Sequence, residues 1–311
     1  MEESQKSSRD LTFDIARALC MLWIIGVWHI FVYIGHTEIL SADIEVVTKS
    51  VLACFTFISG YFLGKKCTPP LTFYYIRFKR FYVLFVVACL LMLGKKQLFL
   101  TVTGLCNFIL PQPLTLWYMA MLLLFYMFTP YIIRGRGSWQ QWLLLRGLTI
   151  WALLRVFMHY NMMDPRVPYY FLFYNLGLIT TNAVYEKAVD CKFWLCGFSL
   201  IMTILCMRYS PLQCLAPFFG MIIIIAVSSM LKDMKLLNFN MVMAFVSYSS
   251  LCAYLYHRPI YRIFWSHLAN ESGVISLYYV PLMVLTVIVV SWAVQRVYDK
   301  YIMRVFDKIK M

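Results

Sequence analysis

Charged residues, and acidic ones above all, are scarce in this sequence. Only 14% of its 311 residues are Asp, Glu, Lys or Arg, whereas 62% are hydrophobic, and the mean hydropathy is +0.72. This composition excludes a soluble globular domain, whose surface needs far more charge. The alternating ten-residue pattern of an outer-membrane barrel is also missing. The long apolar runs therefore predict membrane-spanning helices.

The sequence also lacks paired cysteine motifs. The ten cysteines are scattered, mostly within apolar runs, and none of them forms a C-x-x-C pair. No Cys/His spacing typical of a zinc site occurs either. We interpret the cysteines as small apolar fillers, and we expect no metal, no disulfide and no tightly bound cofactor.

Apolar segments of about 20 residues, the length that crosses a bilayer, recur along the whole chain. They predict an all-α, polytopic bundle of about ten transmembrane helices that forms a single integral membrane domain, 1–311. The apolar stretch 97–110 is shorter, and we expect it to be interfacial or re-entrant. No small-residue cleavage site follows the first span, which we interpret as an uncleaved signal-anchor. The predicted spans are 13–34, 44–64, 74–93, 114–133, 139–159, 170–186, 193–207, 213–231, 239–264 and 274–296.

Lysine and arginine are distributed unevenly between the two sets of connections. Eighteen lie in or next to the tails 1–12 and 297–311 and the loops on the same side, against four in the alternate loops. The positive-inside rule then places both termini in the cytoplasm and requires an even number of spans. It also explains the net charge of +14 without a nucleic-acid partner.

The first span carries three ionisable residues, Asp14, Arg17 and His29. A charge near the bilayer centre costs about 2.5–3.5 kcal/mol, so such groups usually face a cavity or a partner. Asp14 and Arg17 are three residues apart and could pair on one helix face. Two interpretations stand: a tunnel with a charged mouth and an imidazole inside, or a snorkelling Arg17 with His29 hydrogen-bonded between helices.

A second histidine lies deep in the ninth predicted span. His257 has Tyr254 and Arg258 beside it, and Pro259 would loosen the helix there. Since this span starts on the cytoplasmic side, His257 reaches about the same outer depth as His29. Two deep histidines favour a shared polar pocket over two unrelated ones.

Two further clusters allow both a structural and a functional interpretation. Arg77, Lys79 and Arg80 lie at the cytoplasmic border, where they could anchor the helix or bind the phosphates of coenzyme A. Trp117 and Tyr118 lie near an outer helix end, where an aromatic belt is expected, although such rings could also stack on a sugar.

Small residues end the second span, in the sequence FTFISGY at 55–61. Gly60 and Gly64 are four residues apart, a spacing that lets two helices approach closely. We interpret these glycines and Ser59 mainly as packing residues.

Taken together, these segments resemble a known family. The residues that carry the resemblance are Asp14, Arg17 and His29 of the first span, FTFISGY, the R-x-x-R of Arg77 and Arg80, LWY at 116–118, and SYSSLCAYLYHRP at 247–259. In this order, over residues 14–264, they resemble the acyltransferase 3 family, bacterial integral membrane enzymes that modify surface polysaccharides and other acceptors.

Two features depart from the family pattern. Eleven residues separate Arg17 from His29 instead of ten, which would turn the two side chains about 120° apart on an α-helix instead of about 20°. Either a π-bulge near Gly26 restores the alignment, or Arg17 does not share the groove with His29. The proline that usually follows R-x-x-R is also missing.

The resemblance implies roles for individual residues. His29 would be the catalytic group, acting as general base or through a transient acyl-imidazole, with Asp14 and Arg17 in the catalytic set. Arg77, Arg80 and Lys79 would bind acyl-CoA. The substrate pocket would be formed by His257, Arg258, Tyr254, Trp117, Tyr118 and Ser59.

The implied function is a membrane-bound O-acyltransferase of the bacterial cytoplasmic (inner) membrane. It would move an acetyl or other short acyl group from acyl-CoA to a sugar hydroxyl of a surface polysaccharide or lipid-linked glycan. Its partners would be the acyl-CoA donor, a carbohydrate or glycolipid acceptor and the lipid bilayer. The rival interpretations are a transporter or flippase for a glycan or lipid-linked sugar, and a purely structural partner in glycan assembly.

Overall fold

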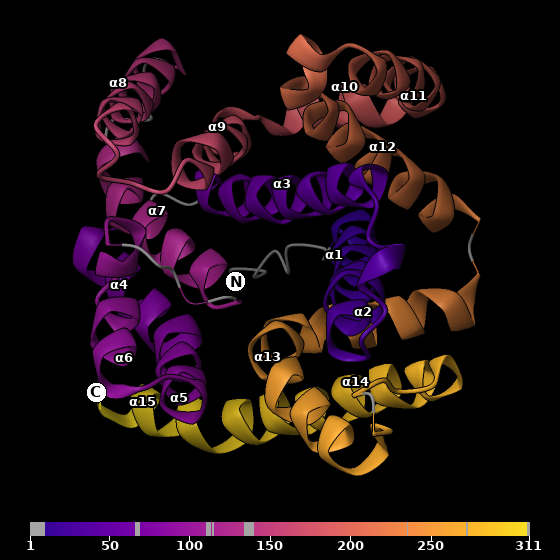
Figure 1. The fold of residues 1–311 in the computed structure, drawn as a ribbon. Coiled ribbons are helices and arrows are strands. Elements are labelled where there is room, and N and C mark those ends of the chain that lie inside the picture. Colours follow the sequence, from indigo (N-terminus) through magenta and orange to yellow (C-terminus); the bar gives the residue numbers. More distant parts are fainter. Residues whose placement is uncertain are drawn as a thin grey trace.

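The computed structural model describes residues 10–65, 69–109, 113, 115–133, 140–234, 236–271 and 273–309. Within these residues all regular secondary structure is helical, as the sequence predicts (Figure 1). Most of tail 1–12 lies outside the described residues. So do seven of the basic residues used to predict topology: Lys6, Arg9, Lys66, Arg134, Arg136, Lys235 and Lys310.

The first predicted span is a composite helix. It consists of α1 (Leu11–Trp23), the π-helix η1 (Ile24–Trp28) and α2 (His29–Tyr33). The other α- and π-helices are α3 (Ala42–Gly64), α4 (Pro70–Arg77), π-helical η3 (Phe78–Tyr82), α5 (Val83–Met92), α6 (Lys95–Val102), α7 (Trp117–Ile133), α8 (Gln140–His159), α9 (Arg166–Ile179), α10 (Asn182–Asp190), α11 (Lys192–Arg208), α12 (Ala216–Asp233), α13 (Leu237–Leu268), α14 (Val280–Val297), π-helical η7 (Tyr298–Ile302) and α15 (Met303–Ile309). Short 3₁₀ turns cover η2 (Thr37–Ile39), η4 (Leu105–Asn107), η5 (Ser210–Leu215) and η6 (Leu277–Tyr279).

By length and composition, five helices of the described chain could cross a membrane, and a bent pair, α10 and α11, would make a sixth. Helices occupy every one of the ten predicted ranges, but the number ten remains a prediction. The predicted span 170–186 is broken into two helices. Helix α9 ends at Ile179, and the Thr181 hydroxyl caps a new helix by accepting the Val184 N–H. The five candidates are Leu11–Tyr33, Ala42–Gly64, Ser210–Asp233, Asn238–Leu268 and Leu277–Lys308.

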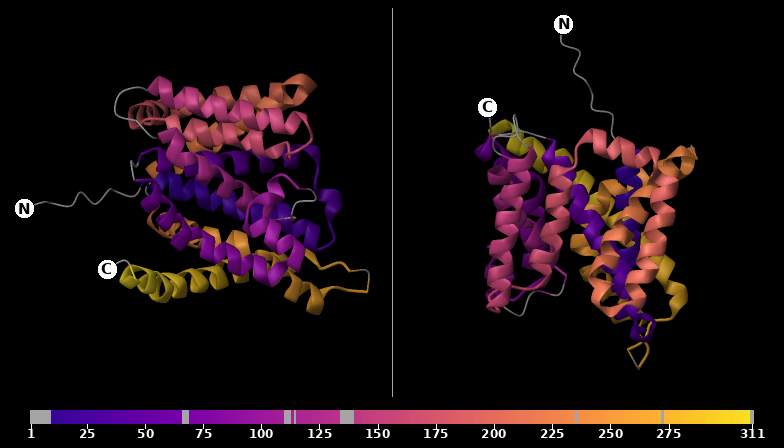
Figure 2. Two further views of the ribbon diagram at one scale, coloured as in Figure 1. Left: turned by 90° about the vertical axis from the view of Figure 1, so that its left-hand side faces the viewer. Right: turned by 90° about the horizontal axis from the view of Figure 1, so that it is seen from above.

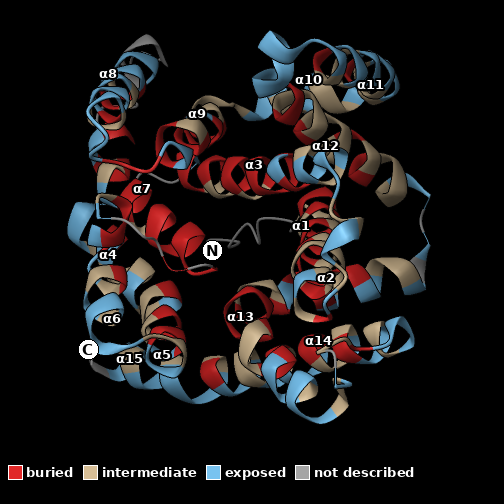
Figure 3. Ribbon diagram, viewed as in Figure 1, coloured by how far each residue is buried: buried red, intermediate tan, exposed pale blue. Residues whose placement is uncertain are grey.

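Large apolar side chains lie on the outside of the bundle as well as inside it. Helices α11 and α14 expose long apolar faces, and Trp194 on α11 is 86% exposed (Figure 3). In water such faces would drive aggregation, whereas lipid tails solvate them. The outer surface therefore agrees with a multi-pass membrane protein.

Helices α3 and α9 pack backbone against backbone in the core. A Cβ atom at Gly60 would lie 2.1 Å from the Tyr174 carbonyl oxygen, and one at Gly177 would lie 2.2 Å from that of Phe57. Only glycine allows the two backbones to come this close. The interpretation of the small residues near Ser59 as packing residues is confirmed, with α9 as the partner helix.

The helices run side by side, and the two ends of the bundle differ (Figure 2). α15 and the start of α1 lie at one end, where Asp10 pairs with Lys232 of α12 at 3.5 Å. The turn between α13 and α14 lies at the other end, where the Ile275 N–H donates to the Ile34 carbonyl. We call these the basic end and the opposite end, because Lys79, Lys192 and Lys232 form ion pairs at the first.

Candidate active site

A π-helical turn sets the direction of His29. The turn η1, Ile24–Trp28, contains Gly26, so of the two alternatives that the Arg17–His29 spacing allows, the structure has the π-bulge. One extra residue in such a turn takes up about 100° of rotation, so the offset of about 120° falls to about 20°. Arg17 and His29 therefore both face the interior of the bundle.

The structure brings the two deep histidines together, as the sequence predicts. The rings of His29 and His257 stack at 4.7 Å between centroids and 6° between planes. The Tyr254 ring lies 6.4 Å from the first and 6.0 Å from the second. These three side chains come from the first span and from α13, and we call them the histidine layer.

His257 is fully buried, and the backbone fixes its tautomer. Its Nδ1 lies 2.8 Å from the Tyr254 carbonyl oxygen and 3.1 Å from that of Ala253, so Nδ1–H donates to them. In a neutral ring, Nε2 is then an unprotonated acceptor. Among the described residues, neither this Nε2 nor the buried Nδ1 of His29 has a hydrogen-bond partner. Unsatisfied polar atoms in a core are uncommon, and they mark the layer as a functional candidate.

A cavity of about 530 Å³ lies on the basic side of the histidine layer, and we call it the basic cavity. Arg17, Arg77 and Arg80 line it, together with Ser59 and Tyr254. Three guanidinium groups around one space form a suitable site for phosphate, which arginine binds through a planar fork.

Arg77 is held in place by aromatic rings. Its guanidinium carbon lies 5.6 Å from the Phe73 ring centroid and 5.7 Å from that of Tyr126. Its buried Nε has no hydrogen-bond partner among the described residues. The side chain is thus oriented and retains an unused donor for an anion.

Lys79 does not line the basic cavity, although the sequence groups it with the two arginines. Its Nζ pairs with Asp307 of α15 at 2.5 Å. Residues two apart on a helix point to different sides, so Lys79 faces away from Arg77. The ion pair fastens η3 to the C-terminal helix.

Asp14 and Arg17 each have a defined contact of their own. Asp14 is buried and accepts a hydrogen bond of 2.8 Å from the Ser247 hydroxyl. The guanidinium carbon of Arg17 lies 4.9 Å from the Phe62 ring centroid. The direct Asp14–Arg17 pair remains a prediction.

Sequence reasoning missed an acidic group on the wall of the basic cavity. Asp299, within the π-helix η7, accepts hydrogen bonds from Tyr248 at 2.5 Å and from Gln295 at 3.0 Å. All three residues line the cavity. The available signals were the polar run SYSS at 247–250 and an acidic residue within the basic C-terminal segment.

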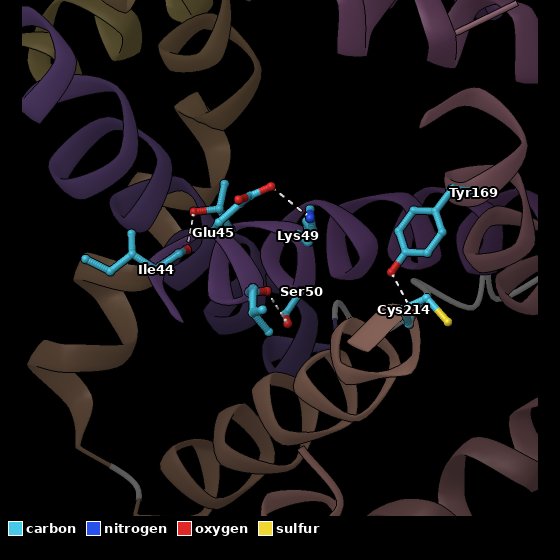
Figure 4. A network of polar contacts seen from close by, with 8 residues as sticks. Ile44, Glu45, Lys49, Ser50, Tyr169 and Cys214 are labelled. Atoms are coloured by element: carbon cyan, nitrogen blue, oxygen red, sulfur yellow. Dashed lines mark hydrogen bonds and ion pairs between the residues drawn. The ribbon is translucent and has the colours of Figure 1, made fainter. Parts of the chain in front are cut away.

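A second cavity, of about 590 Å³, lies on the other side of the histidine layer, and we call it the outer cavity. His29 lines it, as do Glu45, Lys49 and Tyr169. Figure 4 shows the Glu45–Lys49 ion pair of 2.8 Å, and the Tyr169 hydroxyl donating to the Cys214 carbonyl at 3.1 Å. The cavity combines aromatic faces with charged groups.

Trp117 and Tyr118 are buried inside the bundle, so their interpretation as a lipid-facing aromatic belt is wrong. Their exposed fractions are 9% and 2%. Trp117 lines the outer cavity, with the Arg166 guanidinium 4.0 Å from its ring centroid. Tyr118 lines the basic cavity, and its hydroxyl lies 3.2 Å from that of Thr56. The LWY segment thus separates the two spaces.

Helix α3 shows that the two cavities lie at different depths. Glu45 on the outer cavity and Ser59 on the basic cavity are fourteen residues apart on this helix, about 21 Å at 1.5 Å per residue. Tyr254 lines the basic cavity, His29 lines the outer one, and the two rings are neighbours. The histidine layer therefore lies between the cavities.

Comparison with known protein families agrees with the motifs. A family model described as an acyltransferase domain, that of the acyltransferase 3 family, matches residues 10–296. The chain belongs to this family. No curated protein and no solved structure matches the chain. As an acyltransferase 3 protein, it is a membrane acyltransferase, and the histidine layer lies within the matched region.

Proposed function

We propose that the protein transfers an acetyl or other short acyl group from acyl-CoA to a sugar hydroxyl of a surface polysaccharide or lipid-linked glycan. The proposed setting is the bacterial cytoplasmic membrane, with the basic end in the cytoplasm. In support, eleven Lys and Arg residues lie on the described helix ends and connections of the basic end, against four on those of the opposite end, which agrees with the positive-inside rule.

One observation carries the proposal: His29 lies between a cavity lined by three arginines and a cavity lined by aromatic side chains. Coenzyme A is made in the cytoplasm and carries several phosphates, which suits the basic cavity. A sugar offers hydroxyls and apolar ring faces, which suits the outer cavity with Trp117 and Tyr169.

In the proposed reaction the acceptor hydroxyl oxygen attacks the thioester carbonyl carbon, and the C–S bond breaks. The imidazole of His29 accepts the hydroxyl proton and passes it to the departing thiolate, so no other reactant is needed. A neutral imidazole is suited to this role. His257 is a positioning residue here, because its backbone-bonded ring stacks on His29 and limits its rotation.

Replacing His29 by alanine tests the proposal. General acid–base catalysis contributes about 10²–10⁴-fold, so His29→Ala is expected to lose at least about 100-fold in acyl transfer while remaining folded. The readout is mass spectrometry of surface glycans, which identifies the added acyl group by its mass. A matched control is His159→Ala, an exposed histidine at the end of α8. Normal acylation by the His29 variant would refute the proposed role.

A further inference from the structure

A third cavity, of about 510 Å³, lies beside the histidine layer and is used by neither proposed substrate. It lies between the end of α5 and the later part of α13. These two helices pack side by side (Figure 1). Arg258 and Arg262 line it from α13, and Leu91 and Leu93 from the end of α5. The sequence assigns Arg258 to the pocket of the histidines, but its side chain lines this separate space.

The two arginines are an unusual pair for a membrane helix. They are four residues apart, so they lie on the same face, where like charges repel. In the described part of the chain, no carboxylate forms a salt bridge with either of them. The Arg258 guanidinium carbon lies 5.5 Å from the Tyr33 ring centroid, a contact that does not neutralise its charge.

One N–H of Arg258 has no hydrogen-bond partner in the described part of the chain. Its Nε is buried, and among the described residues nothing accepts its hydrogen bond. A half-buried guanidinium with an unused donor and a second positive charge one turn away is complementary to a doubly charged anion. Phosphate fits this description, because its oxygens can bind both forks at once.

The walls of the cavity indicate where this phosphate comes from. Leu91 is 63% exposed and Ile263, the residue after Arg262, is 60% exposed. These side chains continue the apolar outer surface of α5 and α13, which is suited to hydrocarbon chains. A free anion would gain nothing from them, whereas a lipid places its phosphate at the membrane surface directly above its acyl chains.

We propose that Arg258 and Arg262 bind the phosphate group of a phosphorylated membrane lipid whose hydrocarbon chain lies along Leu91 and Ile263. The Tyr254 hydroxyl, which donates to the Thr115 carbonyl at 2.8 Å, connects this cavity to the histidine layer. A bound lipid headgroup is therefore adjacent to the site of the proposed reaction. The inference does not depend on that reaction, because binding is measured without turnover.

The test is a binding titration on the purified full chain in detergent, read by native mass spectrometry. The probes are dioleoyl phosphatidic acid, dioleoylglycerol, which lacks the phosphate, and inorganic phosphate. We expect phosphatidic acid to bind at least about tenfold more tightly than dioleoylglycerol, and the double variant Arg258→Gln, Arg262→Gln to lose that preference. Arg208→Gln removes an exposed arginine at the same end of the bundle and is expected to bind like the wild type.

Two results would overturn the proposal. One is wild-type binding of phosphatidic acid by the double variant, which would remove the arginines from the site. The other is displacement of the lipid by equimolar inorganic phosphate, which would indicate a site for the free anion. If the double variant fails to fold, Arg262→Gln alone still decides, because this side chain is exposed and its loss leaves the core intact.

Discussion

Replacing Gly60 by alanine is expected to destabilise the protein through the α3–α9 contact. The added Cβ would lie 2.1 Å from the Tyr174 carbonyl oxygen, about 1.3 Å closer than the 3.4 Å of ordinary contact. The obstacle is backbone, so no side-chain rotation relieves the overlap. The two helices have to separate, and the gap removes dispersion contacts along the interface.

The size of the effect follows from two opposing terms. Alanine in a helix gains about 0.5–1 kcal/mol over glycine, because the unfolded chain has less freedom to lose. Overpacking typically costs about 1–3 kcal/mol, and an overlap with backbone lies at the top of this range or beyond it. We expect a net loss of about 2 kcal/mol or more. At about 2–4 °C per kcal/mol, the Tm falls by about 4–8 °C.

The assay is thermal unfolding of purified variants in one detergent, followed by intrinsic fluorescence. The matched control is Gly197→Ala in the exposed part of α11, where a Cβ would meet no atom within 4 Å. That variant is expected to melt at or slightly above the wild-type temperature. A second variant sharpens the test: Gly177→Ala strains the same interface, so the double variant should lose less than the sum of the two. A Gly60→Ala protein as stable as Gly197→Ala would refute the reasoning.

Three other predictions concern the candidate site. Arg77→Ala is expected to raise the KM for acyl-CoA about 10- to 100-fold, because a hydrogen bond to a charged group contributes about 1.5–3 kcal/mol. An unchanged KM would show that Arg77 does not bind the donor. Lys79→Ala should leave that KM within about twofold of the wild type, because Lys79 pairs with Asp307 outside the cavity; a loss like that of Arg77 would contradict this placement. Inserting an alanine after Gly26 should turn the His29 side chain by about 100° and abolish acyl transfer. Deleting Gly26 should convert the π-turn to regular α-helix and retain activity. Equal activity of the two variants would contradict the role of the turn.

The helical, membrane-embedded nature of the chain could be predicted from its sequence because lipid imposes one strong rule. Every backbone N–H and C=O in hydrocarbon needs an internal partner, so long apolar runs fold as helices. The boundaries were less predictable where polar side chains compete for those groups. At Thr181 a side-chain cap replaces the helical bond, and the apolar run from 170 to 186 divides into α9 and α10. Hydropathy alone does not register such a break.

The proximity of His29 and His257 could be predicted because the direction of each span gives the depth of its residues in the membrane. Positive-inside counting fixes the direction of each span, and the rise per residue then gives depth. The side of a helix on which a residue lies, and the neighbouring helix that it faces, could not be derived from this count. Trp117 has the depth of an aromatic belt but faces the interior, and Arg258 has the depth of the histidines but lines another cavity. Which side of a helix faces the core depends on its neighbours, and the sequence does not specify them.

The π-turns explain why side-chain directions calculated with a constant α-helical period were wrong for part of the candidate site. Each of the turns η1, η3 and η7 adds a residue to its helix and so rotates everything after it by about 100°. All three adjoin the candidate site: η1 precedes His29, η3 contains Arg80, and η7 contains Asp299. The first turn could be inferred because family motifs lie on both sides of it, so the extra residue was countable. The other two have a motif on one side at most, and nothing in the sequence revealed the added residue. The arginine cluster and the C-terminal segment were therefore assigned by proximity in sequence, and this is where Lys79 was misplaced and Asp299 was missed.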